Sequence, residues 1–159
     1  MSLSKSSIIA FVATTNPERS KKFYSETLGL KLVGEDPFAL VYDAGGTMLR
    51  VATVQVIQPA GYTVLGWVVR DIRDSVFDLV GKGVQFRRYE GMDQDEHGIW
   101  RSPSGARIAW FTDPDGNTLS LTEFERKGRS SHRPKSRRKS SRRPRVLARS
   151  NRSSRPRRP

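Results

Sequence analysis

Residues 1–125 of this chain carry one pattern twice, and this internal repeat constrains the fold more than any other feature of the sequence. Each copy has a short apolar run, a capped amphipathic segment that ends at glycine, and later a turn containing Asp and Gly that precedes another apolar run. The landmarks are Asn16, Gly29 and residues 43–46 in the first copy, and Asp71, Gly83 and residues 113–116 in the second. A duplicated unit folds as two similar modules, and we expect a ligand site at the seam between them.

The first copy predicts a strand, a helix and three further strands. Asn16 is a good N-cap, Pro17 suits the first helical position, and Gly29 is a natural helix stop. Short apolar runs predict strands at residues 8–13, 30–33, 39–42 and 48–56. The first module is therefore expected to be β-α-β-β-β.

The second copy repeats this order. Asp71 caps a helix with Asp74 at the capping-box position, and strands are predicted at residues 64–69, 84–86, 107–111 and 118–122. Strand alternation places Trp67 on the face toward the helices, whereas for Trp110 core and cavity both stay open. Residues 87–105 hold about 15 residues more than the equivalent part of the first copy. Loops of this length are often functional, and we interpret this one as a lid.

The motifs resemble those of the vicinal oxygen chelate superfamily, which includes glyoxalase I, bleomycin-resistance proteins and extradiol dioxygenases. The resemblance covers about residues 7–124 and is carried by Phe23-Tyr24, Leu28-Gly29-Leu30, and Asp113-Pro114-Asp115-Gly116-Asn117 leading into Leu119-Ser120-Leu121. It implies an α+β fold in which two βαβββ modules, at about residues 7–56 and 62–124, form an open curved sheet around a cavity. The predicted domain is residues 1–126.

The resemblance also implies four positions at which the metalloenzymes of this family bind a divalent cation. Counting from the helix caps and the turns places them at Ile9, Arg50, Val64 and Ser120. Zn, Ni, Fe or Mn sites need imidazole or carboxylate ligands, so these residues predict a protein with no metal and no cofactor.

The same cavity face predicts a site for a small anionic or flat apolar molecule. Arg50 would bind a carboxylate or phosphate through two hydrogen bonds, or would instead pair with an acid of the protein. The candidate ligand-binding residues are Ile9, Phe11, Met48, Arg50, Val64, Trp100 and Ser120.

A second hypothesis keeps an enzyme of the glyoxalase or dioxygenase kind with a displaced site. His97 and Glu96 are its weak catalytic candidates, and with Asp93 they would form a metal or acid/base site in the inserted loop. The alternative for these residues is a solvated acidic loop.

The basic charge of the chain lies in its last part. Residues 127–159 hold 15 Lys and Arg and no acid, which leaves 14 basic and 16 acidic residues in residues 1–126. The tail has too few apolar residues to bury and is predicted to be disordered. Three readings stay open: out-of-frame translation, a segment that binds nucleic acid or another polyanion with strong salt dependence, and a solvated extension.

Composition excludes several other classes. There is no Cys, hence no disulfide framework, and no apolar run long enough to span a membrane. No secretory signal is evident, so we expect a cytoplasmic protein. Two modules can complete a cavity within one chain, but similar proteins often form homodimers.

Overall fold

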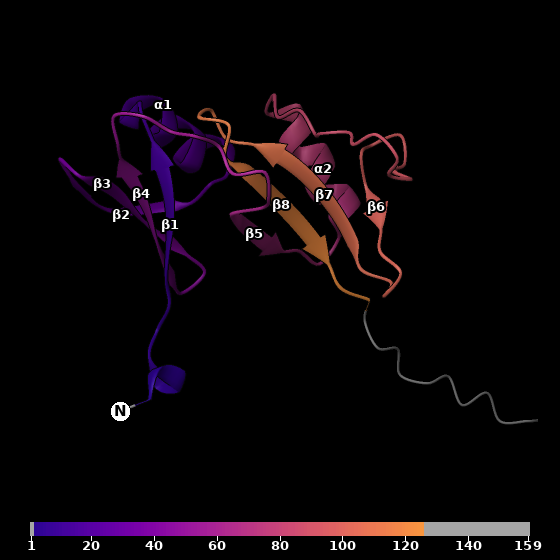
Figure 1. The fold of residues 1–159 in the computed structure, drawn as a ribbon, viewed down its shortest axis with the longest axis horizontal. Helices are drawn as coiled ribbons and strands as arrows, with labels where there is room; N and C mark the ends of the chain where they lie inside the picture. The colour runs from indigo at the N-terminus through magenta and orange to yellow at the C-terminus, as the bar shows by residue number, and fades with distance from the viewer. Residues whose placement is uncertain (1, 126–159) are drawn as a thin grey trace, which may run out of the picture. The chain divides into compact units, whose positions relative to one another are not determined.

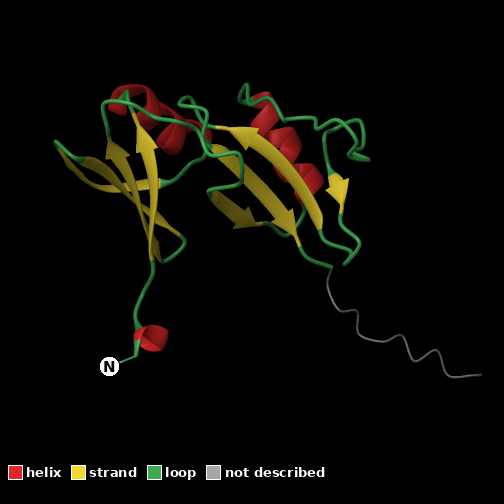
Figure 2. Ribbon diagram, in the orientation of Figure 1, coloured by secondary structure: helices red, strands yellow, loops and turns green. Residues whose placement is uncertain are grey.

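The computed structural model describes residues 2–125. The basic tail lies outside the described residues, so the structure does not test the three interpretations of its sequence. The described part contains two four-stranded sheets, each accompanied by a helix (Figures 1 and 2).

Module one consists of sheet A and its helix. Its strands are β1 (Ile9–Thr14), β2 (Lys31–Asp36), β3 (Ala39–Ala44) and β4 (Thr47–Thr53), in the spatial order β1-β4-β3-β2. Strand β1 pairs parallel to β4, and the other pairs are antiparallel. Helix α1 (Pro17–Lys22) continues into a π-helical segment (Phe23–Thr27), and a short 3-10 turn (Leu3–Lys5) precedes β1.

Module two repeats this topology. Its elements are β5 (Leu65–Val68), α2 (Ile72–Gly81), β6 (Trp100–Arg101), β7 (Arg107–Thr112) and β8 (Thr118–Glu123), in the sheet order β5-β8-β7-β6. Strand β5 pairs parallel to β8, as β1 does to β4. The predicted fold of two βαβββ modules with open sheets is confirmed.

One strand prediction in module two was wrong. Residues 84–86 form only an isolated bridge between Phe86 and Phe111, and the edge strand is instead β6, inside the inserted segment. Val84 is buried in the core cluster of module two and Phe86 packs against that cluster, so their apolar character reflects packing rather than strand pairing.

The predicted helix boundaries hold because their caps form. The side chain of Asn16 accepts a hydrogen bond from the N–H of Arg19 at 3.0 Å, and that of Asp71 accepts one from the N–H of Asp74 at 3.1 Å. Gly29 follows the first helix with φ of 70°, a conformation that a side chain disfavours.

The two modules share apolar packing. Each has its own buried cluster between its helix and its sheet, and Phe23, Leu28, Val64 and Leu65 pack against both clusters. Residues from each module thus contribute to the core of the other, and the arrangement of the two sheets is stabilised by burial of common apolar surface.

The turn before β8 joins the modules through Asp115. Its carboxylate accepts hydrogen bonds from the hydroxyl of Thr14 at 2.7 Å, from the N–H and hydroxyl of Thr15 at 3.0 and 2.7 Å, and from the hydroxyl of Ser20 at 3.2 Å. Arg19 forms an ion pair with it at 3.2 Å. Burial alone would raise the pKa of Asp115, but these hydrogen bonds outweigh it and hold the pKa below its ordinary value.

Asp113, at the start of the same turn, makes a second connection. Its carboxylate accepts a hydrogen bond from the hydroxyl of buried Tyr24 at 2.8 Å, and burial together with this carboxylate raises the pKa of the tyrosine. Asn117 donates to Asp113 and to the backbone carbonyl of Ala13, each at 2.8 Å. The turn therefore fixes β8 relative to β1 and α1.

Among residues 2–125, no helix has the length and apolar character needed to cross a membrane.

Candidate ligand-binding site

Each sheet has one face that its own helix does not cover, and we call these the open faces of sheets A and B. The repeat places equivalent residues on them. Phe11 pairs with Arg50 across the parallel strands of sheet A, and Gly66 pairs with Ser120 across those of sheet B. Ile9 precedes Phe11 by two residues, just as Val64 precedes Gly66. The four positions counted from the sequence thus occupy matching places in the two modules.

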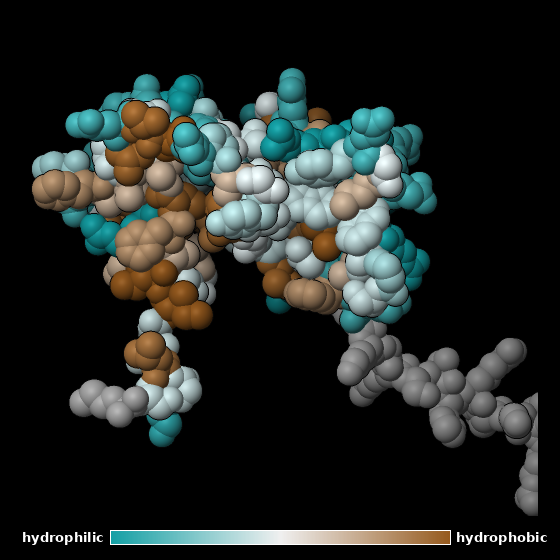
Figure 3. Space-filling view, in the orientation of Figure 1, coloured by the Kyte–Doolittle hydropathy of each residue, from teal (hydrophilic) through white to brown (hydrophobic). Residues whose placement is uncertain are grey.

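The open face of sheet A is apolar and exposed. Ile9 pairs with Met48 on neighbouring strands, and Phe11 follows on the same face. Their exposed fractions are 47% for Ile9, 59% for Phe11 and 43% for Met48. Figure 3 shows apolar side chains at the surface over the strands of module one. A surface of this kind is typical of a binding face.

Arg50 provides the cation on this face. One of its guanidinium nitrogens lies 3.4 Å from a carboxylate oxygen of Asp36, and both side chains are partly exposed. The backbone N–H of Phe38, helped by that of Ala39 and by Arg50, holds the pKa of Asp36 below its ordinary value. Of the two roles that the sequence left open for Arg50, the structure contains the pair with an acid. Exposed pairs contribute little to stability, so a ligand anion can exchange with this carboxylate.

Ser120 lies on the open face of sheet B and is nevertheless buried. A Cβ atom added to its neighbour Gly66 would lie 2.5 Å from the Ser120 hydroxyl oxygen. The glycine therefore makes room for the hydroxyl at the floor of this face.

Three aromatic side chains, Trp100, Trp110 and Tyr89, line the same side, and we call them the aromatic wall. Trp110 pairs with Ser120 across β7 and β8, which puts its indole on the open face. Its ring centre lies 6.1 Å from that of Trp100 and 5.6 Å from that of Tyr89. Its indole N–H donates to the hydroxyl of Thr63 at 3.0 Å. Tyr89 and Trp110 were not among the predicted site residues. For Trp110, the pairing with Ser120 across the turn at residues 113–116 is the signal that indicates the open face.

Two predicted residues from different modules line a common groove. Phe11 and Val64 both contact a groove of about 290 Å³ whose other walls come mainly from the connection between the modules, residues 54–60. The remaining predicted residues fall into two groups: Ile9, Met48 and Arg50 on sheet A, and Trp100 and Ser120 on sheet B.

The inserted segment is not a free lid. The Gln94 side chain accepts a hydrogen bond from the N–H of Tyr89 at 2.7 Å and donates to the carbonyls of Arg87 and Gly98 at 3.0 and 2.8 Å. Trp100, within this segment, pairs with Ile108 of β7. The extra residues therefore extend the sheet and carry part of the aromatic wall.

His97 and Glu96 lie on the helix side of module two. The His97 ring packs against Phe77 of α2 with 4.7 Å between ring centres, and its Nε2 is 3.4 Å from the Glu96 carboxylate. In the same loop, Asp95 accepts the N–H groups of His97 and Ile99 and pairs with a surface arginine. Asp95 thus stabilises the conformation of this loop. His97 and Glu96 lie on the side of the sheet opposite the aromatic wall.

The side chains at the four family positions on the open faces are not the ligands that a divalent metal ion needs. Within residues 2–125 there is no group of three His, Cys, Asp or Glu side chains close enough to hold one ion. The four family positions present two aliphatic side chains, a guanidinium and a hydroxyl, which are not ligands for Zn, Ni, Fe or Mn.

Comparisons with solved structures identify the same fold. The glyoxalase family protein of Enterococcus faecalis is 21% identical, with a TM-score of 0.61 over 77% of this chain and 100% of that chain. A superfamily member from Sphaerobacter thermophilus is 26% identical, with a TM-score of 0.58 over 74% and 97%. A lactoylglutathione lyase of Agrobacterium tumefaciens is 16% identical, with a TM-score of 0.59 over 76% and 95%.

No curated protein matches the sequence. The family model described as Glyoxalase/Bleomycin resistance protein/Dioxygenase superfamily matches residues 8–121, which is most of the chain. The resemblance inferred from the motifs is confirmed, and the chain belongs to the glyoxalase/bleomycin resistance protein/dioxygenase superfamily.

Proposed function

We propose that this member of the superfamily binds a small, planar, anionic molecule on its open faces, in the cytoplasm, without the divalent metal of the family enzymes. The observation that carries the proposal is the set of side chains at the four equivalent positions: Ile9, Arg50, Val64 and Ser120. This set offers apolar surface, one cation and one hydroxyl, which suits binding of an organic anion better than polarisation of a substrate by a metal.

The aromatic wall supports a planar ligand. Trp100 and Trp110 are only partly buried. The adjacent residues of the open face of sheet B, Gly66 and Ser120, are small and leave space beside the indoles. A flat ring placed over this floor would contact an indole by stacking or edge to face, with a gain of about 0.5–1.5 kcal/mol beyond burial.

Two cations support the negative charge of the ligand. Within residues 2–125 the salt bridge of Arg50 is its exposed pair with Asp36, and a ligand carboxylate would form a more complete, two-point contact. Arg87 lies with its guanidinium 5.9 Å from the Tyr89 ring centre, at the edge of the aromatic wall.

Titration with naphthoate and with its neutral match, naphthalene methanol, tests the proposal. We expect Arg50→Ala to weaken naphthoate at least tenfold, because a hydrogen bond to a charged group contributes about 1.5–3 kcal/mol, and to leave the neutral compound nearly unchanged. The measurement is NMR of the indole N–H signals of Trp100 and Trp110 together with calorimetry.

Arg70→Ala is the matched control, since Arg70 is exposed and forms no ion pair within residues 2–125. Equal loss of naphthoate affinity in both variants would contradict the role of Arg50. Purified protein holding one equivalent of Zn, Ni, Mn or Fe, removed by EDTA together with an activity, would overturn the proposal as a whole.

A further inference from the structure

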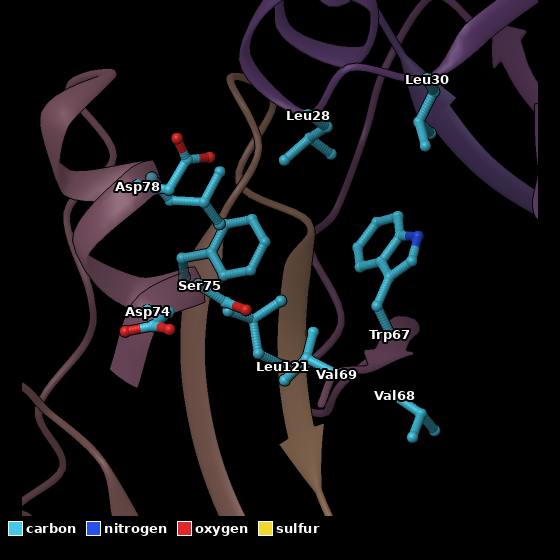
Figure 4. A pocket seen from close by; sticks show the side chains of 11 residues that line it. Leu28, Leu30, Trp67, Val68, Val69, Asp74, Ser75, Asp78 and Leu121 are labelled. Carbon is cyan, nitrogen blue, oxygen red and sulfur yellow. The ribbon is translucent and has the colours of Figure 1, made fainter. Parts of the chain in front are cut away.

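A second groove lies on the opposite side of sheet B, between α2 and the indole of Trp67, with a volume of about 460 Å³ (Figure 4). Phe111 of β7 and Leu121 of β8 line it as an apolar floor. Leu28 lies at its upper end. Ser75 of α2 points into it from the wall facing Trp67. The groove shares no lining residue with the aromatic wall or with Arg50.

Local features of the chain create this groove. Trp67 pairs with Leu121 in register, so its indole lies on the helix face of the sheet, as alternation predicts. The stop at Gly29 ends the first helix, and both residues beside the glycine, Leu28 and Leu30, line the groove. Helix α2 covers only part of the sheet, and module one supplies the rest of the boundary.

The charged residues of the groove are all acidic. Asp74 and Asp78 line its helix wall, and among residues 2–125 no Lys, Arg or His lines the groove. Asp78 forms one exposed ion pair with Lys82 at 2.8 Å, and Asp74 forms none within residues 2–125. The groove therefore presents two carboxylates on its helix wall, one of them already paired with Lys82.

Helix stability accounts for Asp74 but not for Asp78. Asp74 stands in the first turn of α2, where an acid interacts favourably with the helix dipole. Asp78 stands near the C-terminal end, where the dipole disfavours an acid, and its i,i+4 pair with Lys82 offsets this cost. The net effect of Asp78 on helix stability is therefore small.

We propose that this groove binds a small organic cation with an apolar body, such as an arylalkylamine or a quaternary ammonium compound. The volume lies within the range of sites for small molecules, about 300–1,000 Å³. The apolar floor would bury the body of the ligand, the Trp67 indole would attract the cationic head by a cation–π contact, and the two carboxylates would balance its charge. This site is separate from the proposed anion site on the open faces and does not depend on it.

The test compares phenethylamine with phenethyl alcohol and phenylpropanoate, which are neutral and anionic compounds of similar size. We expect the native full-length protein to bind the amine best, and the NMR signal of the Trp67 indole N–H to shift while those of Trp100 and Trp110 stay in place. Assignment uses single Trp→Phe variants. Asp74→Asn with Asp78→Asn should weaken the amine at least tenfold and leave the alcohol unchanged.

Glu90→Gln with Asp93→Asn removes the same charge from exposed positions outside the groove and should leave amine binding unchanged. Thermal unfolding of both double variants confirms that they are folded before affinities are compared. Equal affinity for amine and alcohol in the native protein, equal weakening by the two double variants, or shifts at Trp100 and Trp110 in place of Trp67 would each overturn the proposal.

Discussion

At the scale of single residues, Asp115 joins the two modules through several hydrogen bonds. The carboxylate is nearly inaccessible, with 2% of its side chain exposed, and its hydrogen bonds reach residues about 100 positions earlier in the chain. The motif predicted a turn at residues 113–116, and the turn is present. Its partners in module one were not predicted, because turn propensity reports only the local backbone.

Asp115→Asn is expected to lower the free energy of unfolding by about 1–3 kcal/mol near neutral pH, because the buried hydroxyls of Thr14 and Ser20 lose their charged acceptor. The folded pKa of Asp115 lies below its ordinary value of about 3.9, so its contribution is complete above that pH and is lost as pH falls through the folded pKa. The stability difference from the native protein should therefore shrink in acid. Urea unfolding across pH measures it.

Asp93→Asn is the control for this experiment, since Asp93 is exposed and should show no such difference. A stability difference for Asp115→Asn that stays constant well below pH 4 would contradict the assignment of a depressed pKa to this carboxylate.

At the scale of elements, both helices begin where their sequence signals predict. The edge strand of sheet B does not form where its sequence pattern predicts. Caps and a glycine stop act within a few residues, so Asn16, Gly29 and Asp71 were sufficient to locate both helices. The edge strand depends on which segment reaches β7. Residues 84–86 have the stronger strand pattern, but their side chains pack in the core, and Trp100 and Arg101 take the edge.

Asp71→Ala should destabilise the protein by about 1 kcal/mol, because the N–H of Asp74 loses the acceptor that caps α2. Asp71→Asn keeps an oxygen at the same place and should cost much less. Chemical denaturation of the two variants compares them directly. A similar loss from both substitutions would show that the charge of Asp71, rather than its hydrogen bond, stabilises the helix.

At the scale of the whole molecule, the open face of sheet A leaves three large apolar side chains in water. Covering such a face is favourable by about 25 cal/mol for each Å² of apolar surface, and a second copy of the chain would supply a matching surface. This supports the homodimer that the family resemblance implies. The ligand would then lie against a face that the partner helps to close.

We expect twice the monomer mass in sedimentation equilibrium at micromolar concentration, and a monomer for Phe11→Lys, because a charge at the centre of this face opposes its burial. Phe77→Lys is the matched control: Phe77 is similarly exposed, at 52%, but lies on α2. A native monomer, or dissociation by both substitutions, would contradict this interface.

Local patterns in the chain were enough to predict the βαβββ order of both modules, both helix starts and the turns. These features depend on periodicity and on caps, which act over a few residues. The family resemblance, together with strand alternation, placed Ile9, Phe11, Met48 and Arg50 on one face. Long-range packing decided the rest: the pairing of Arg50 with Asp36, the aromatic wall around Trp110, the hydrogen bonds of Asp115 and the acidic groove beside Trp67. Each of these brings together side chains from separate elements, and which elements meet depends on the burial of apolar surface shared by both modules.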